Sequence, residues 1–255
     1  MKFKSIPAII LTASAMAAGP LFSQEEPPPT EAPPFAGKTI EELSADDVLK
    51  LVRYSYTLFN REFGGQLRLG LVKKVPFRLV LKPESIRFVF NDPSQVIYLD
   101  TRNKDFSLFE GIGGEDLKPV TPDRYGETIR GTDATYDDLS MRFLYWPNAK
   151  IVKEEKYKTL DTWLVRVRNP DNRGLYSTVD CWIDKGSGGL IKMLGYNRQG
   201  RPIRRFEVLH GKKFGDVWMV DEMRIESISS ASGKVLSSTR LQITERLDEP
   251  PAPAE

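Results

Sequence analysis

The sequence predicts a mainly β protein with some α-helix, built as one strongly curved antiparallel sheet of about eleven strands. Apolar residues recur at helical spacing in two stretches, whereas most of the remaining chain alternates apolar and polar residues with a period of two. Turn residues separate the alternating stretches at short intervals. Strands that follow one another so closely pair as antiparallel neighbours, because a parallel pair requires a long crossover.

The first ordered element is predicted to be an N-terminal helix. Ser44, followed three residues later by Asp47, resembles a capping box. Gly64-Gly65 is predicted to end the segment. The residues that recur at helical spacing, and that we expect to pack on an apolar surface, are Val48, Leu51, Val52, Ser55, Leu58 and Phe59.

Four strands are predicted next, each with one apolar face, as in a sheet that is covered on one side. A loop rich in glycine and proline, with room for a short helix, is predicted over residues 105–125, and a mid-chain helix over residues 135–144. Asp137 and Asp138 lie in the first turn of that helix, where negative charge complements the helix dipole. The four strands span residues 67–71, 77–82, 86–90 and 96–99.

Seven more strands are predicted after the mid-chain helix, with turns rich in Asn, Asp, Gly and Pro between them. The only histidine, His210, is predicted to lie in a solvated turn. The seven strands span residues 149–155, 160–169, 177–184, 189–197, 203–210, 217–229 and 235–247. The basic pairs expected on solvated strand ends or turns are Lys73-Lys74, Arg204-Arg205 and Lys212-Lys213.

The N-terminus has the pattern of a secretory signal peptide. Lys2 and Lys4 precede an apolar run that is too short for a good membrane-spanning helix, although an uncleaved anchor is the alternative. Cleavage is expected after Ser23, with Ala17 as the second choice. The expected organisation is a signal peptide (1–23), a proline-rich disordered linker (24–38), one domain (39–247) and a disordered acidic, proline-rich tail (248–255).

The amino-acid composition limits the classes of partner and the cellular compartment that we expect. Loss of the signal peptide leaves 35 basic residues against 35 acidic ones, which argues against nucleic acid or an anionic membrane surface as the main partner. The only cysteine, Cys181, lies far from the cleavage site, so we expect no lipidated N-terminus. We therefore expect a soluble, monomeric periplasmic protein, with Cys181 as a small core residue.

The polar residues do not form a catalytic constellation. With one histidine and one cysteine, the chain offers neither a nucleophile–base pair nor a tight zinc site. The glycine-rich run at residues 111–114 precedes no basic residue and is a poor phosphate loop. A glycosidase-like carboxylate pair stays open, but no feature selects one. We predict a protein that is not an enzyme and that carries no metal and no cofactor.

Residues 131–139 read GTDATYDDL, and this motif resembles the outer-membrane lipoprotein-sorting family, the LolA-like periplasmic carriers. Ala134 departs from the family pattern, which usually has an aromatic residue there. The resemblance spans residues 39–247 in the order of elements and implies an unclosed half-barrel, with the two helices as plug or lid. The matching positions are Gly131, Thr132, Asp133, Tyr136, Asp137, Asp138 and Leu139.

The inward faces of the predicted strands are strongly apolar. Methionine and phenylalanine suit an adaptable acyl-chain site, and the resemblance implies a hydrophobic cavity; a simple filled core is the alternative. The candidate ligand-binding residues are Leu67, Leu69, Phe77, Leu79, Phe88, Phe90, Trp163, Val165, Met193, Met219, Met223 and Ile225.

The resemblance implies a periplasmic carrier or chaperone that binds the acyl chains of lipoproteins for sorting to the outer membrane. Its partners would be lipoproteins or lipids, an inner-membrane donor complex and an outer-membrane acceptor. A lipid-sensing regulatory module and a carrier of other amphiphiles, such as glycolipids or hopanoid-like lipids, are the alternatives. Asp133 and Thr135 are expected to cap the mid-chain helix rather than contact a ligand.

Overall fold

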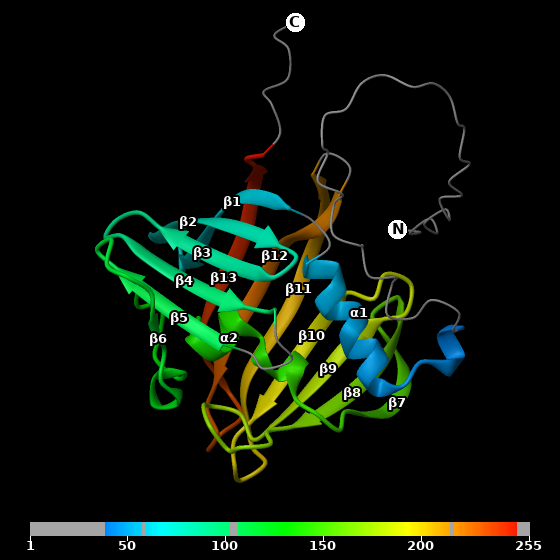
Figure 1. Cartoon of the computed structure of the whole chain (residues 1–255). Coiled ribbons are helices and arrows are strands. Elements are labelled where there is room, and N and C mark those ends of the chain that lie inside the picture. Colours follow the sequence, from blue (N-terminus) through cyan, green and yellow to red (C-terminus); the bar gives the residue numbers. More distant parts are fainter. Residues whose placement is uncertain (1–38, 58–59, 103–106, 215–216, 249–255) are drawn as a thin grey trace, which may run out of the picture.

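A single antiparallel sheet of thirteen strands dominates the computed structural model, which describes residues 39–57, 60–102, 107–214 and 217–248 (Figure 1). Two meanders make up this sheet, because β1 to β6 pair in chain order and so do β7 to β13. The first strand pairs with the last, with Leu67 opposite Leu241, and this pairing joins the meanders. The expected signal peptide and linker, and all but the first residue of the expected tail, lie outside the described residues.

The first meander contains β1 (Arg61–Leu69), β2 (Lys73–Lys82), β3 (Ser85–Phe90), β4 (Gln95–Asp100), β5 (Ser107–Ile112) and β6 (Lys118–Pro119). The second contains β7 (Lys150–Tyr157), β8 (Leu160–Arg168), β9 (Thr178–Asp184), β10 (Leu190–Tyr196), β11 (Pro202–Phe214), β12 (Val217–Ile228) and β13 (Val235–Arg246). The helices are η1 (Ile40–Glu42), α1 (Ala45–Thr57), η2 (Pro122–Arg124), α2 (Tyr136–Ser140) and η3 (Arg142–Tyr145).

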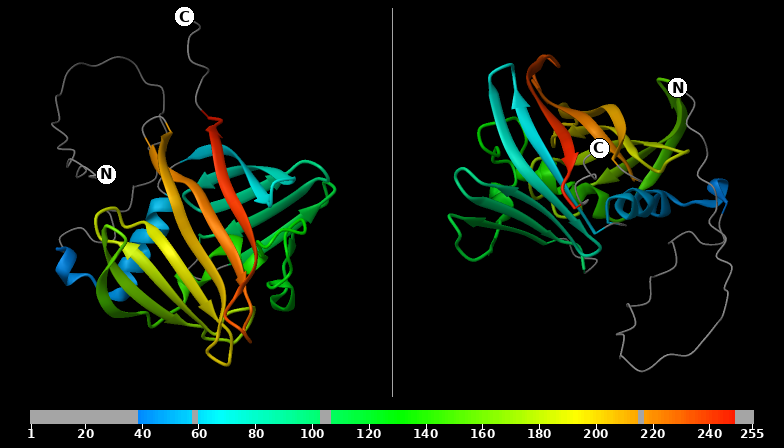
Figure 2. Two further views of the ribbon diagram at one scale, coloured as in Figure 1. Left: turned by 180° about the vertical axis from the view of Figure 1, so that it is seen from behind. Right: turned by 90° about the horizontal axis from the view of Figure 1, so that it is seen from above.

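The sheet curves around its helices without closing. Its edge strands are β6 and β7, which do not pair with each other. Seen from above, the two meanders form arms with α1 and α2 between them (Figure 2). The fold class predicted from the sequence, a curved antiparallel half-barrel with an N-terminal and a mid-chain helix, is confirmed.

Helix α1 begins as its sequence predicts. The Ser44 backbone N–H donates to the Asp47 carboxylate at 3.2 Å, and the Asp47 backbone N–H donates back to Ser44 Oγ at 3.2 Å. These reciprocal bonds satisfy backbone donors at the exposed helix end. The helix ends at Thr57, so Leu58 and Phe59 of the predicted stripe lie outside the described residues.

The mid-chain helix is shorter than predicted. Thr135 is its N-cap, as expected, and accepts a hydrogen bond from the Asp138 backbone N–H. However, α2 ends at Ser140, because Met141 adopts a left-handed backbone conformation with φ 45°. The chain then continues as the short 3-10 helix η3 rather than as one helix to residue 144.

Two predictions about the strands were wrong. The predicted loop over residues 105–125 contains β5 and the two-residue β6, whose Pro119 is tolerated because it lies on an edge strand. His210 is not in a turn, since β11 continues past it to Phe214. The register of β11 against β12 shifts on both sides of His210. The residues at this irregularity, His210, Gly211 and two lysines, are of the kinds that also occur in turns, which is why the sequence predicted a turn here.

Gly64 and Gly65 do not end the helical segment but lie inside β1. A Cβ atom at Gly65 would lie 2.6 Å from the Gln242 carbonyl oxygen of β13 and 2.6 Å from Cζ of Phe77. Glycine is therefore required here because the neighbouring strand and an aromatic ring occupy the space of a side chain.

We predict that Gly65→Ala lowers the free energy of unfolding by about 1–3 kcal/mol, because the added methyl group overpacks the β1–β13 junction. Urea denaturation measures the change. Gly211→Ala is the matched control, since a Cβ there meets its nearest neighbour at an ordinary 3.6 Å. Equal stability of the two variants would contradict this explanation.

Candidate functional site

The strand registers place all twelve candidate residues on one face of the sheet, which we call the inner face. In the first meander, Gly65 of β1 lies opposite Phe77, and Leu79 lies opposite Phe88. Directly opposed residues on paired strands point to the same side of the sheet, and alternate residues along a strand share a face. The same rule places the other candidates of this meander on the inner face. In the second meander the pairs are Leu241 with Met223, Ile225 with Phe206, Phe206 with Met193, Met193 with Cys181, and Cys181 with Val165.

Most of the inner face is buried in the structure. Nine of the twelve candidates belong to the hydrophobic core cluster, while Met219 and Met223 are partly buried against it. Leu69, at the end of β1, is half-buried. The nine core members are Leu67, Phe77, Leu79, Phe88, Phe90, Trp163, Val165, Met193 and Ile225.

Helix α1, which we call the cover helix, lies over this face. Its Cα atoms approach β2 of one arm, β7 of the other, and η3. Val48, Leu49 and Val52 are at most 1% exposed and belong to the same core cluster. Arg53 donates a hydrogen bond to the Leu144 carbonyl and lies 5.0 Å from the centre of the Tyr145 ring. The buried face of the cover helix is therefore apolar, with a polar link to η3.

The segment of residues 129–146, which we call the anchored segment, covers the rest of the inner face and is held differently. Asp133 is only 8% exposed and accepts hydrogen bonds from the hydroxyls of Ser227, Ser237 and Thr239. Its backbone N–H donates to Thr239 Oγ1 at 2.8 Å. Asp133 therefore connects this segment to β12 and β13 and does not cap α2, so the capping role predicted for it was wrong.

Asp138 extends the network to the middle of the second meander. It accepts a hydrogen bond from the Tyr176 hydroxyl, and Arg204 Nε of β11 lies 3.4 Å from Oδ2. Burial raises the pKa of the Asp138 carboxyl, and the positive charge of Arg204 opposes this effect. The prediction that Arg204 is solvated was wrong, because its charge is needed beside this buried carboxylate.

Asp137, which is fully buried, joins the anchored segment to the loop before β9. Its carboxylate accepts from Arg142 Nε at 2.5 Å and from the Leu175 backbone N–H at 2.6 Å. The Arg142 guanidinium also donates to the Arg173 carbonyl and lies 4.9 Å from the centre of the Tyr125 ring. Both acids of the first turn of α2 thus make tertiary contacts beyond any interaction with the helix dipole.

Tyr136 connects α2 to β5. Its hydroxyl donates to Glu110, which also accepts from Gln95 at 2.6 Å and from Arg124 at 3.0 Å. Burial alone would raise the pKa of Glu110, but these hydrogen bonds and the charge of Arg124 together lower it below its ordinary 4.5. The anchored segment is thereby attached to both arms of the sheet.

Cys181 lies on the inner face, opposite Met193 on one side and Val165 on the other. Cys181 is fully buried, as predicted, and burial strongly raises the pKa of its thiol. Within the described ranges, no group of three or more His, Cys, Asp or Glu side chains is placed to hold a metal ion. No helix among them combines the length and apolar character needed to cross a membrane.

Two open hollows occur on the surface rather than on the inner face. One, of about 340 Å³, lies beside Asn172, Arg173 and Arg198, and the other, of about 430 Å³, lies beside Glu154 and Lys185. None of the twelve candidate residues lines either hollow. The covered state of most of the inner face is shown instead by the burial of its side chains.

Comparisons with known proteins agree with this architecture. A family model described as "Uncharacterized protein" matches residues 115–250. No curated protein matches the sequence.

Three solved structures share the fold at low sequence identity. A "putative outer membrane lipoprotein-sorting protein domain" from Vibrio parahaemolyticus has a TM-score of 0.64 at 14% identity, over 82% of this chain and 93% of that one. A DUF1329 family protein from Desulfovibrio piger has a TM-score of 0.61 at 14% identity, over 80% and 92%. A LolA superfamily protein from Nitrosomonas europaea has a TM-score of 0.57 at 13% identity, over 82% and 96%.

We predict that Asp133→Ala lowers the free energy of unfolding by about 1–3 kcal/mol or more, because three hydroxyl donors lose their common acceptor. Chemical denaturation measures the loss. Asp123→Ala, an exposed acid on η2, should change stability by less than about 0.5 kcal/mol. A similar small effect at Asp133 would show that the network does not hold the anchored segment.

The lowered pKa of Glu110 predicts a pH-dependent contribution to stability. A carboxyl whose pKa is lower in the folded state stabilises the fold above its unfolded pKa, and this contribution disappears as the pH falls through the folded value. The difference in unfolding free energy between wild type and Glu110→Gln should therefore shrink as the pH is lowered from neutral through the acidic range below the ordinary pKa of 4.5. Denaturation curves across this range provide the test, with Asp123→Asn as control, and a constant difference would contradict the assignment.

Proposed function

Because the chain belongs to the family of uncharacterized proteins whose model covers residues 115–250, and has a LolA-like fold, we propose that it is a carrier of lipid acyl chains. The acyl chains would lie on the inner face, in place of the cover helix. We further propose that the cargo is lipoprotein, collected from an inner-membrane donor and delivered to an outer-membrane acceptor. The protein would act in the periplasm, without catalysis.

The observation that carries this proposal is the apolar inner face beneath a separate helix. A sheet that needed only a filled core could close on itself or pack on a second sheet. Here the two arms stay apart, and α1 and the anchored segment occupy the space between them (Figure 2). The side chains beneath include Met193, Met219 and Met223, whose flexibility suits a surface that must fit different apolar partners.

The energies of covering and of binding are comparable. Burial of three side chains such as Val48, Leu49 and Val52 contributes roughly 5–9 kcal/mol, at about 1.5–3 kcal/mol each. An acyl chain contributes about 0.8 kcal/mol for each buried CH2, so about ten methylenes offset the loss of the helix contacts. Exchange between helix and acyl chain is therefore nearly balanced, as a carrier requires for both loading and release.

The two covering elements differ in what their displacement costs. Removal of the anchored segment would separate the carboxylates of Asp133, Asp137 and Asp138 from their hydrogen-bond and ion-pair partners. The partners that stay buried, such as the charge of Arg204, would then be unpaired, which costs several kcal/mol. Displacement of α1 exposes apolar side chains that an acyl chain can replace. We therefore propose that α1 moves and that the anchored segment stays in place during loading.

We predict opposite effects on lipid affinity from two substitutions that both destabilise the fold. Leu49→Ala weakens the cover helix, so a fluorescent fatty acid competes with it more easily and its affinity should rise several-fold. Met223→Gln puts an amide on the inner face, so affinity should fall at least about tenfold. Ligand titration gives the affinities, and thermal unfolding verifies that each variant is folded.

Lys50→Ala is the matched control on the exposed side of the same helix, and its affinity should equal that of wild type. A folded wild type that does not bind, or two variants that change affinity in the same direction, would argue against the carrier proposal. Native mass spectrometry of protein purified from the periplasm then identifies the cargo, because a lipoprotein and a free lipid differ in mass.

A further inference from the structure

Four large aliphatic side chains are exposed on two neighbouring hairpins. Leu71 and Val72, at the turn between β1 and β2, are 89% and 92% exposed. Val235 and Leu236, at the start of β13, are 47% and 70% exposed. Such exposure of consecutive aliphatic residues at a tight turn contributes nothing to folding stability, so it calls for a partner.

The sheet register brings these hairpins together at one end of the molecule. Leu69, the last residue of β1, lies opposite Thr239 of β13, so the β1–β2 turn and the start of β13 extend beyond the same pair. In the view from above, the β1–β2 hairpin (cyan) and the β12–β13 hairpin (orange to red) extend toward the same side of the molecule, and the view from behind shows that the β12–β13 hairpin reaches farther down (Figure 2). The four side chains therefore lie at the same end of the β1–β13 pair.

Three basic residues lie beside these side chains. Lys73, Lys74 and Lys234 are exposed, and none of them forms an ion pair with a carboxylate in the part of the chain that the structure describes. The Lys73 ammonium donates instead to the Gly131 carbonyl at 3.1 Å. Residues 66–76 and 227–238 contain no Asp or Glu. The local charge is thus positive, although the mature chain as a whole is expected to be balanced.

We propose that this region, the hairpin patch, docks the protein on the surface of an anionic lipid membrane. Its members are Leu71, Val72, Lys73, Lys74, Lys234, Val235 and Leu236. Aliphatic side chains at the tips of narrow hairpins can enter the boundary between headgroups and acyl chains. Lysine side chains beside them reach phosphate groups with their ammonium ions while their methylenes stay in the apolar layer.

Two features favour a membrane over a protein partner. Leu71 and Val72 lie in a turn, and Val235 and Leu236 directly follow one, whereas a protein interface gains its affinity from large, well-packed surfaces. In addition, lysine is depleted in protein interfaces but is effective on anionic bilayers, where its flexible side chain needs no fixed geometry. The position is also separate from the inner face, so docking does not occupy the proposed cargo site.

The test is co-sedimentation of the purified protein with vesicles of phosphatidylcholine alone or of equal parts phosphatidylcholine and phosphatidylglycerol. The wild type should bind the mixed vesicles at low salt and much less at high salt, because salt screens the lysine charges. Leu71→Ser combined with Val72→Ser should weaken binding at least about tenfold. Lys74→Gln combined with Lys234→Gln should weaken it about fivefold for each charge removed.

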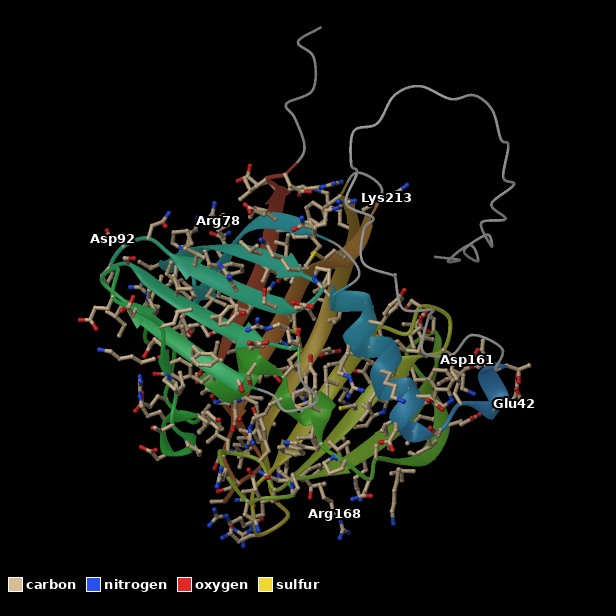
Figure 3. The ribbon with its side chains drawn as sticks, viewed as in Figure 1. Glu42, Arg78, Asp92, Asp161, Arg168 and Lys213 are labelled. Atoms are coloured by element: carbon tan, nitrogen blue, oxygen red, sulfur yellow. The ribbon has the colours of Figure 1, made fainter. Side chains whose placement is uncertain are left out.

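Matched controls carry the same changes away from the hairpin patch. Lys212→Gln with Lys213→Gln removes two charges near the end of β11, which pairs with the start of β12 and so lies far from the β12–β13 turn; Figure 3 labels Lys213. Val152→Ser changes an exposed valine of β7, which is 47% exposed. Both controls should bind vesicles as the wild type does, and circular dichroism establishes that every variant is folded.

Three outcomes would overturn the proposal: a wild type that ignores the mixed vesicles, hairpin variants that bind as well as wild type, or controls that lose binding to the same degree. Binding of a fluorescent fatty acid should be unchanged in the hairpin variants. Hairpin variants that lose vesicle binding but keep fatty-acid binding would support the docking proposal without bearing on the carrier proposal. A wild type that binds vesicles but not the fatty acid would contradict the carrier proposal alone.

Discussion

The pairing of β1 with β13 is the constraint on which the rest of the structure depends. Without it the chain would form two separate meanders, each with an apolar face too open to bury itself. Gly65 allows the close approach of the β13 backbone and of Phe77 at this junction. Asp133 binds β12 and β13 immediately beside it. The β1–β13 junction thus joins the two meanders into one sheet and also lies next to the strands that hold the anchored segment.

The inner face is covered by two elements that are held by different interactions. The anchored segment is held by buried carboxylates, each with at least one charged or hydroxyl partner, and such a network permits only one position because any shift leaves charges unpaired. The cover helix lies on the same face mainly through aliphatic side chains, which accept any apolar partner of suitable shape. A protein that must exchange its own helix for a ligand benefits from this division, because the fold survives while the apolar contacts change.

Docking through the proposed hairpin patch would fix the orientation of the molecule on a membrane. The inner face and the patch involve the same strands, β1 and β13, but the inner face lies along the strands while the patch lies at their ends. A carrier docked through these ends would hold its sheet upright on the bilayer. The positive charge of the proposed patch is local, so a chain with a formal net charge of only +2 could still direct one end toward anionic lipid.

Much of the fold could be predicted from periodicity. The alternation in residues 77–82 and 86–90, and the helical spacing from Val48 to Val52, come from side chains that must reach one core, so local pattern and final structure agree. The predicted loop over residues 105–125 concealed β5, because one of its two buried inward positions is Glu110, an acid that breaks the apolar alternation and is satisfied by Tyr136. Likewise, Gly64-Gly65 reads as a break until the close approach of β13 is known.

The sequence by itself determined the fold class, the Thr135 cap and the shared apolar face, because each depends on spacing along a few consecutive residues. Only the tertiary structure decided the roles of Asp133 and Arg204, whose partners lie about one hundred and about seventy residues away along the chain. It also decided that α1 lies over the inner face. The physical reason is that a buried charge is satisfied by whichever group the fold brings near it, and no local pattern records that group.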